Sequence, residues 1–234
     1  MSASAARENA ILPNNGVFVA VYRIPSETLW FPSPEEADES GLLGIGGDLS
    51  AERLIAAYSM GIFPWYSDGP VLWWSPDPRC VLPLAAMHVS HRLQRSLRRK
   101  PFDFSLNKAF GEVVRACADS PRPGTTGTWL NQDMIEAYEG LHRLGFAHSI
   151  EVWQHDRLAG GIYGVALGRA FFGESMFYRV TDASKAALII LVEYLKKMDF
   201  TLFDCQQYTA HMHRFGAVEI ARADFVRQLE EALR

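Results

Sequence analysis

Two adjoining stretches decide the fold: AHSIEVWQHDRLAGGIYGVALGRAFFGESMFY at residues 147–178 and TDASKAALIILVEYLKKM at residues 181–198. The first contains three runs rich in apolar, β-branched and aromatic residues, separated by short turns, which is typical of an antiparallel meander. The second predicts a long helix with Thr181 or Asp182 as its N-cap. Strands followed by a helix indicate an α+β domain.

The flanking residues extend this pattern in both directions. FTLFD at 200–204 reads as a short buried strand, and a last helix begins near Asp224. Two more helices are expected at about 107–118 and 131–143. The pattern resembles an N-acetyltransferase-type domain, in which a glycine-rich turn at a helix N-terminus binds the pyrophosphate of coenzyme A. The corresponding turn here, YRVTDASK at 178–185, has no glycine, which argues against a coenzyme A donor.

The N-terminal part is less regular. The first 25 residues are expected to form a loosely ordered extension, and a helix is expected at about 51–60 after the capping residues Asp48 or Ser50. IFPWYSDGPVLWWSPDPRC at 62–80 is too rich in proline for a regular element and predicts a loop ordered by its aromatic side chains. We therefore expect an extension at 1–25, a small α/β domain at 26–82 and an acetyltransferase-like, mixed-sheet domain at 83–234.

Composition narrows the class of protein. The 234 residues include three widely spaced cysteines and no C-x-x-C, which favours a reducing compartment. A secretory signal is not recognisable, and no run approaches the ~20 apolar residues that span a bilayer, so no membrane contact and a cytoplasmic location are expected. Because the net charge is −4, contact with nucleic acid requires a local basic patch.

One such patch is HVSHRLQRSLRRK at 88–100. It concentrates five cations within nine residues, namely Arg92, Arg95, Arg98, Arg99 and Lys100. Helical spacing places Arg92, Arg95 and Arg99 on one face. A solvated helix face is one interpretation of this run, and binding of nucleic-acid phosphates is the other.

Glu174 lies inside an apolar run, AFFGESMFY at 170–178. Strand alternation places Phe172, Glu174 and Met176 on one face, and Phe171 and Phe177 on the other. An edge strand with Glu174 in water is one possibility. Since its expected neighbours are apolar, a paired or functional carboxylate is the alternative.

FDCQQYTAHMH at 203–213 ends a strand and begins a loop, where chemistry is often located. Asp204 and Gln206 should share a face, and we prefer to interpret them as a hydrogen-bonding carboxylate–amide pair. Cys205 as a nucleophile paired with a histidine is a weaker alternative, because neighbouring strand residues point to opposite faces and a buried, inert thiol is more common. A metal site of Asp204, His211 and His213 is also weaker, because no H-E-x-x-H or cysteine-rich pattern supports it. No metal is expected.

Eight stretches together resemble the leucyl/phenylalanyl-tRNA–protein transferase family: GLLGIGGDLSAERLIAAYSMGIFPWY, WWSPDPRCVL, TGTWL, AHSIEVW, GGIYGVALG, FFGESMF, DASKAAL and FDCQ. The resemblance runs from about Phe31 to Phe225, and HMHRFGA at 211–217 departs from it, since the family more often reads close to H-x-x-S-L-G-A. It implies transfer of leucine or phenylalanine from leucyl-tRNA or phenylalanyl-tRNA to proteins with N-terminal Arg or Lys, which marks them for N-end-rule degradation. It implies no cofactor, and we expect a monomer.

The resemblance also implies roles for individual residues. Trp65 and Trp129 would flank the terminal adenosine of the tRNA, Glu174 would face the aminoacyl amino group, and Asp204 and Gln206 would sit at the reacting centre. The pocket for the leucyl or phenylalanyl side chain would be lined by Ile162, Phe171, Met176, Leu188 and Phe203. Because an ordinary aspartate is a weak base for an amine, we expect Asp204 to orient the acceptor, with some proton acceptance. A coenzyme A-dependent N-acyltransferase and a non-catalytic tRNA-binding module are the competing functions.

Overall fold

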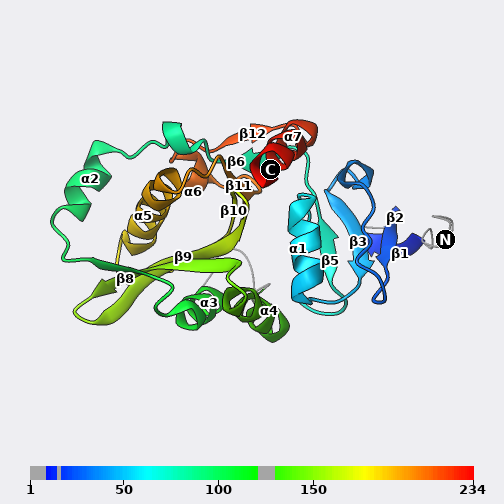
Figure 1. Cartoon of the computed structure of the whole chain (residues 1–234), viewed down its shortest axis with the longest axis horizontal. Helices are drawn as coiled ribbons and strands as arrows, with labels where there is room; N and C mark the ends of the chain where they lie inside the picture. Colours follow the sequence, from blue (N-terminus) through cyan, green and yellow to red (C-terminus); the bar gives the residue numbers. More distant parts are fainter. Residues whose placement is uncertain (1–8, 15–16, 121–129) are drawn as a thin grey trace.

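Two sheets organise the part of the chain that the computed structural model describes, residues 9–14, 17–120 and 130–234. Among these residues the N-terminal sheet has five strands, in the spatial order β1 (Asn9–Asn14), β2 (Val17–Ile24), β3 (Leu42–Gly46), β5 (Leu72–Trp74) and β4 (Phe63–Pro64). Figure 1 shows this unit at one end of the long axis, with the second sheet at the other end. The mixed α+β class predicted from the sequence is confirmed.

The second sheet carries the meander. Its seven described strands lie in the order β12 (Val218–Ile220), β6 (Arg79–Val81), β11 (Leu202–Gln206), β10 (Ala170–Tyr178), β9 (Arg157–Leu167), β8 (Ala147–Gln154) and β7 (Asp103–Leu106). The antiparallel order β8-β9-β10 confirms the predicted meander. β11 pairs with β10 in parallel, and α5 (Ala183–Lys197) provides the crossover that a parallel pair requires.

Helices cover both faces of this sheet (Figure 1). α5 packs on one face through a buried side that includes Leu188, Leu191 and Leu195. α3 (Phe110–Ala118) and α4 (Gln132–Arg143) pack on the other face, and their bounds are close to those predicted. α1 (Ala51–Ser59) and α7 (Arg222–Leu233) contribute side chains to the same hydrophobic core. The remaining described helices are α2 (His91–Leu97), α6 (Ala210–His213) and the short 3₁₀ turns η1 (Pro34–Glu36) and η2 (Leu84–Ala86).

The N-terminal part differs from the prediction in three respects. β1 and β2 form an antiparallel hairpin that pairs with β3, so much of the expected extension belongs to a sheet. The proline-rich stretch 62–80 contains β4, β5 and the start of β6, because its prolines fall mostly between the short pairings. β6 pairs with β11 and β12, so the second sheet takes in residues that precede the boundary expected after residue 82.

Candidate active site

A pocket opens where β10 and β11 separate. The two strands pair only from Ala170 to Phe172 and from Leu202 to Asp204, and they diverge beyond these residues. The space between them is a cavity of about 410 Å³, here called the β10–β11 pocket. It is lined by Ile162 of β9, by Gly173, Glu174, Ser175 and Met176 of β10, by Phe203 and Cys205 of β11, and by Thr209, His211 and Met212 around α6.

A bulge in β10 places Glu174 at this pocket. The pairing with β9 passes from Gly173 opposite Gly164 directly to Ser175 opposite Tyr163, which leaves Glu174 as the extra residue. Phe172 and Phe177 consequently pack in one core, whereas Phe171 and Met176 pack in the other. The predicted alternation, with Phe172 and Met176 on one face, is wrong because the bulge inverts the pattern after residue 174.

Glu174 lies within hydrogen-bond distance of three polar side chains from three different elements. The hydroxyl of Tyr58 on α1 lies 2.8 Å from Oε1, and the hydroxyl of Tyr138 on α4 lies 2.7 Å from Oε2. The side-chain amide of Gln206 also donates to Oε1, at 2.8 Å. The two tyrosine hydroxyl oxygens lie 2.8 Å from each other. The interpretation of Glu174 as a solvated edge residue is therefore wrong.

Burial is the main influence on the acidity of this cluster. Because water cannot reach the carboxylate freely, burial raises the pKa of Glu174 from 4.5 to about 7, although the hydrogen bonds of Tyr138 and Tyr58 act in the opposite direction. Burial, together with the charge of Glu174, holds the pKa values of Tyr58 and Tyr138 well above 10.0. The two hydroxyls therefore stay protonated while Glu174 titrates near neutrality.

Asp204 lies beside this cluster in a fully buried ion pair. Arg79 of β6 binds both of its carboxylate oxygens, with Nε 2.9 Å from Oδ1 and Nη2 2.6 Å from Oδ2. Both side chains are 0 % exposed, and the guanidinium lies over the rings of Phe63 and Phe225. A bidentate pair of this kind fixes the orientation of the carboxylate through two parallel hydrogen bonds.

Asp204 and Gln206 do not form the predicted side-chain pair. Asp204 Oδ1 accepts from the backbone N–H of Gln206 at 2.8 Å, while the Gln206 amide is used by Glu174. The pairing with β6 shifts between these two residues, and Gln206 has a left-handed φ of 63°. The ion pair thus supports the turn that carries Gln206, and Gln206 in turn binds Glu174 in the pocket wall.

The other predicted residues divide into three groups. Ile162, Met176 and Phe203 line the β10–β11 pocket. Phe171 and Leu188 belong to the core behind it, and the ring centroid of Phe171 is 5.4 Å from that of Phe203. Trp65 follows β4 with 39 % of its surface exposed and packs edge-on against Trp74. Trp129 lies outside the described residues.

Comparison with known proteins identifies the family. A model described as leucyl/phenylalanyl-tRNA protein transferase matches residues 81–230, and one described as its N-terminal domain matches residues 47–77. The chain belongs to the leucyl/phenylalanyl-tRNA–protein transferase family. It is therefore an aminoacyltransferase, as the sequence motifs indicated.

Relatives support this over nearly the whole length. The chain is 55 % identical to the leucyl/phenylalanyl-tRNA–protein transferase of Nitratidesulfovibrio vulgaris strain DP4 over 215 residues, 92 % of each chain. It is 55 % identical to that of Anaeromyxobacter sp. strain Fw109-5 over 216 residues, again 92 % of each. A ribosomal-protein-alanine N-acetyltransferase from Brucella melitensis biovar Abortus 2308 covers 43 % of this chain and 75 % of its own, at 16 % identity and a TM-score of 0.33, which is too low for an inference.

Three site residues were missed by the sequence analysis: Tyr58, Tyr138 and Arg79. Tyr58 and Tyr138 occupy buried positions of amphipathic helices, where an aromatic residue is usually core. Arg79 stands next to Cys80 in a stretch interpreted as a loop. Their sequence separations from their partners in the site are 116, 36 and 125 residues, so local pattern carries no signal for these contacts.

The alternatives for residues 203–213 lose support. A hydrogen bond to Cys80 and burial raise the pKa of Cys205 well above 9.0, so its thiol is a poor nucleophile. No group of three or more His, Cys, Asp or Glu suited to a metal occurs within residues 9–14, 17–120 and 130–234.

Within the same ranges no helix is both long and apolar enough to cross a bilayer.

The coenzyme A alternative is also disfavoured by the N-terminus of α5. Asp182 occupies its N-cap, and its carboxylate accepts from Lys185 Nζ and Ser96 Oγ, both at 2.8 Å. A carboxylate at this position repels the phosphates that a glycine-rich turn would bind.

The basic run forms a short helix with a concave surface beside it. α2 covers only His91–Leu97, and Ser90 caps it. A surface hollow of about 530 Å³ is lined by Arg92, Arg95, Ser96, Arg99 and Lys100. Four of the five cations therefore line one hollow, although α2 ends at Leu97, before Arg99 and Lys100. Lys100 differs from the arginines because it donates to Thr181 O and lies 3.6 Å from Asp182.

Proposed function

We propose that this aminoacyltransferase moves leucine or phenylalanine from its tRNA to the N-terminal Arg or Lys of an acceptor protein. The observation that carries the proposal is an apolar pocket with one carboxyl group in its wall. Ile162, Met176 and Phe203 provide the apolar surface, and Glu174 provides the carboxyl group. An aminoacyl moiety has the same two parts, an apolar side chain and an amino group.

The donor would fit with its side chain between β9 and β11 and its amino group at Glu174. Burying an amino group in an apolar pocket without a hydrogen-bond partner costs roughly 1–3 kcal/mol of binding free energy. Glu174 removes this penalty by pairing with the amino group. Gly173 allows β10 to approach Phe203 closely, because a Cβ at this position would lie 2.8 Å from the ring of Phe203. An N-acetylated donor would bring bulk without a cation and should be excluded.

The tRNA would be held by the tryptophans and by α2. The exposed ring of Trp65, together with Trp129, is proposed to flank the terminal adenosine; base–aromatic stacking contributes ~1–3 kcal/mol. Arg92, Arg95, Arg98 and Arg99, with Lys100, are proposed to contact tRNA phosphates. We also propose that the enzyme acts as a monomer.

The chemistry is aminolysis of an ester. The acceptor amine attacks the carbonyl carbon, a C–N bond forms, the C–O bond to the ribose breaks, and the amine proton passes to the ribose oxygen. Because Asp204 is paired with Arg79, we propose that it positions Gln206 and does not itself accept the proton. Gln206 would orient the acceptor, and alignment of amine and ester alone can lower a barrier by several kcal/mol, up to ~7–11.

Transfer of labelled leucine tests this function. The protein is incubated with [¹⁴C]leucyl-tRNA and a purified acceptor bearing N-terminal Arg, and we expect label in the acceptor. The same acceptor with N-terminal Ala, and N-acetyl-leucyl-tRNA as donor, serve as controls and should give little label. Acetyl transfer from acetyl-CoA, or tight tRNA binding without transfer, would contradict the proposal.

Salt dependence tests the role of α2. If Arg95 and Arg99 contact phosphates, replacing both by alanine should reduce the slope of log K against log salt by about 1.4–1.8, since each contact contributes ~0.7–0.9. Filter binding over a salt series measures the slope. The matched control is Arg143→Ala with Arg227→Ala, which removes two exposed arginines from α4 and α7, away from α2 in Figure 1. An equal reduction in the control, or none in the α2 variant, would leave α2 as a solvated face.

A further inference from the structure

Glu174, Tyr58 and Tyr138 form a closed ring of oxygen contacts. Tyr58 contacts Oε1, Tyr138 contacts Oε2, and the two hydroxyl oxygens contact each other, at 2.8, 2.7 and 2.8 Å. Each of these distances is that of an O–H···O hydrogen bond, and each such bond needs one proton. We call this arrangement the hydroxyl ring.

Counting protons decides the state of the ring. Two tyrosine hydroxyls supply two protons for three contacts, since a carboxylate supplies none. With Glu174 ionised, one pair of oxygens would face each other at hydrogen-bond distance with only lone pairs between them. A third proton on Oε2 completes the circuit: Glu174 donates to Tyr138, Tyr138 to Tyr58, and Tyr58 to Oε1.

We propose that Glu174 is a neutral carboxylic acid in the empty pocket, its proton shared in the hydroxyl ring, and that the amino group of the aminoacyl donor takes the place of that proton. The identity of the donor rests on the proposed function. Tyr58 and Tyr138 act as positioning residues, because they hold the carboxyl group and do not line the β10–β11 pocket. Donor binding is then coupled to the loss of one proton.

The groups around the ring are consistent with a neutral acid. Asp204 on β11 adds a negative charge that favours protonation of Glu174, although Arg79 of β6 balances it at close range. Tyr163 of β9 packs edge-on against Tyr138, with ring centroids 5.3 Å apart. From the α6 side the pocket wall contributes His211, whose pKa is lowered by burial. Burial raises the pKa of Glu174 to about 7, which is the direction that the proton count requires.

The sign of the coupling follows from the two free partners. Below about pH 7 the carboxyl group of Glu174 is protonated in the free enzyme. The amino group of the free donor, with a pKa of ~7.7–8.0, is also protonated at this pH, as an ammonium ion. The complex keeps only one of these two protons, shared between the amino group and Glu174, so binding releases one proton and weakens as pH falls. Affinity should peak near pH ~7.4 and decrease about tenfold for each further pH unit below ~6.5.

Infrared spectroscopy of the empty enzyme tests the ring without any donor. The C=O stretching band of a protonated carboxylic acid should be present at about pH 6 in the parent protein, fade above about pH 8, and be missing in Glu174→Gln. Its presence in the parent and loss in the variant support the proposal. A parent spectrum with no band that depends on Glu174 would overturn it.

Calorimetry with a leucyl-adenosine analogue, in which an amide replaces the ester, tests the coupling. We expect roughly 15-fold weaker binding at about pH 5.5 than at about pH 7.4, with close to one proton released at the lower pH. The same analogue without its amino group is the matched ligand and should bind independently of pH. Glu174→Gln should bind the amino analogue weakly at every pH, because the neutral amide imitates the protonated acid.

The outcomes separate the two proposals. If the affinity for the amino analogue did not change with pH, the proton exchange would be overturned. It would also be overturned if Glu174→Gln still lost affinity at low pH, because the titrating group would then be His211. If the infrared band is present but neither analogue binds, the hydroxyl ring is supported. The assignment of an aminoacyl donor to the pocket, and with it the proposed function, would then be overturned.

Discussion

Replacing Arg79 by methionine should lower the free energy of unfolding by about 3–5 kcal/mol, because removing one partner of a buried ion pair leaves an unpaired charge in the interior. Arg79 and Asp204 are each 0 % exposed and share two hydrogen bonds, so Asp204 has no water to replace its partner. Urea denaturation followed by fluorescence measures the change.

Two further variants show whether burial is the cause. Arg115 makes an equally close contact to Glu139, 2.7 Å, but the two side chains are 56 % and 23 % exposed. Arg115→Met should therefore change stability by less than about 1 kcal/mol. The double variant Arg79→Met with Asp204→Leu should recover much of the loss, since no charge is left unpaired. A similar loss in Arg79→Met and Arg115→Met would contradict this account.

Replacing Glu174 by glutamine should reduce kcat/KM for leucyl-tRNA by about 10–100-fold. A hydrogen bond to a charged group contributes roughly 1.5–3 kcal/mol, and a tenfold effect corresponds to about 1.4 kcal/mol. The variant can still close the hydroxyl ring, because its amide donates to Tyr138 where the protonated acid did. The melting temperature should therefore remain within a few degrees of the parent value, and labelled transfer measures the defect.

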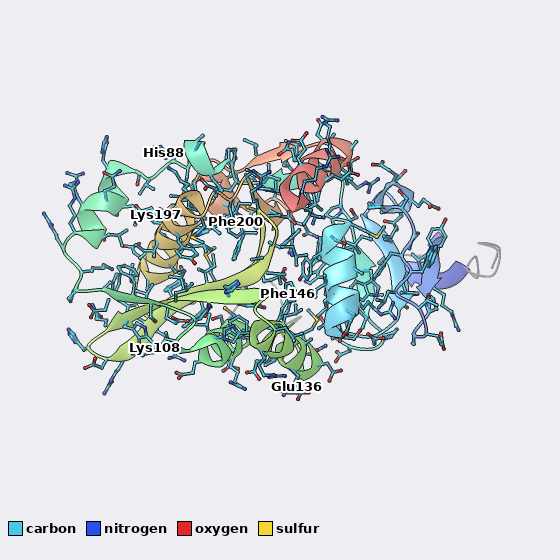
Figure 2. The ribbon with its side chains drawn as sticks, in the orientation of Figure 1. His88, Lys108, Glu136, Phe146, Lys197 and Phe200 are labelled. Carbon is cyan, nitrogen blue, oxygen red and sulfur yellow. The ribbon has the colours of Figure 1, made fainter. Side chains whose placement is uncertain are left out.

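The matched control is Glu136→Gln, the same chemical change on the outer side of α4, where Figure 2 places Glu136. It should transfer leucine at the parent rate. Melting of Glu174→Gln well below the parent, with no defect specific to the donor, would show that the carboxyl group is a structural partner only.

Much of the second domain could be predicted because its signals are local. The runs at 147–178 and the helix after Asp182 have the periodicities of strand and helix, and each lies within a few residues of its prediction. The position of Glu174 in an apolar run also indicated a paired carboxylate. The short strands at 63–64, 72–74 and 79–81 were missed, since two or three residues are too few to show a period.

The arrangement of the site required the tertiary structure. The bulge in β10 turns Glu174 toward the pocket, and a one-residue insertion leaves no clear mark in composition. Phe171 and Leu188 lie in the core behind the pocket, and the divergence of β10 from β11 decides that Ile162, Met176 and Phe203 line it.

The sequence by itself determined the class of fold, the order of the main elements and, through its motifs, the family. The tertiary structure decided which polar groups meet: Tyr58 and Tyr138 at Glu174, and Arg79 at Asp204. Periodicity is a property of neighbouring residues, whereas these contacts join segments 36 to 125 residues apart. Burial then raises the pKa of Glu174 to about 7, because the protonation of a carboxyl group depends on the water and charges around it and not on its place in the chain.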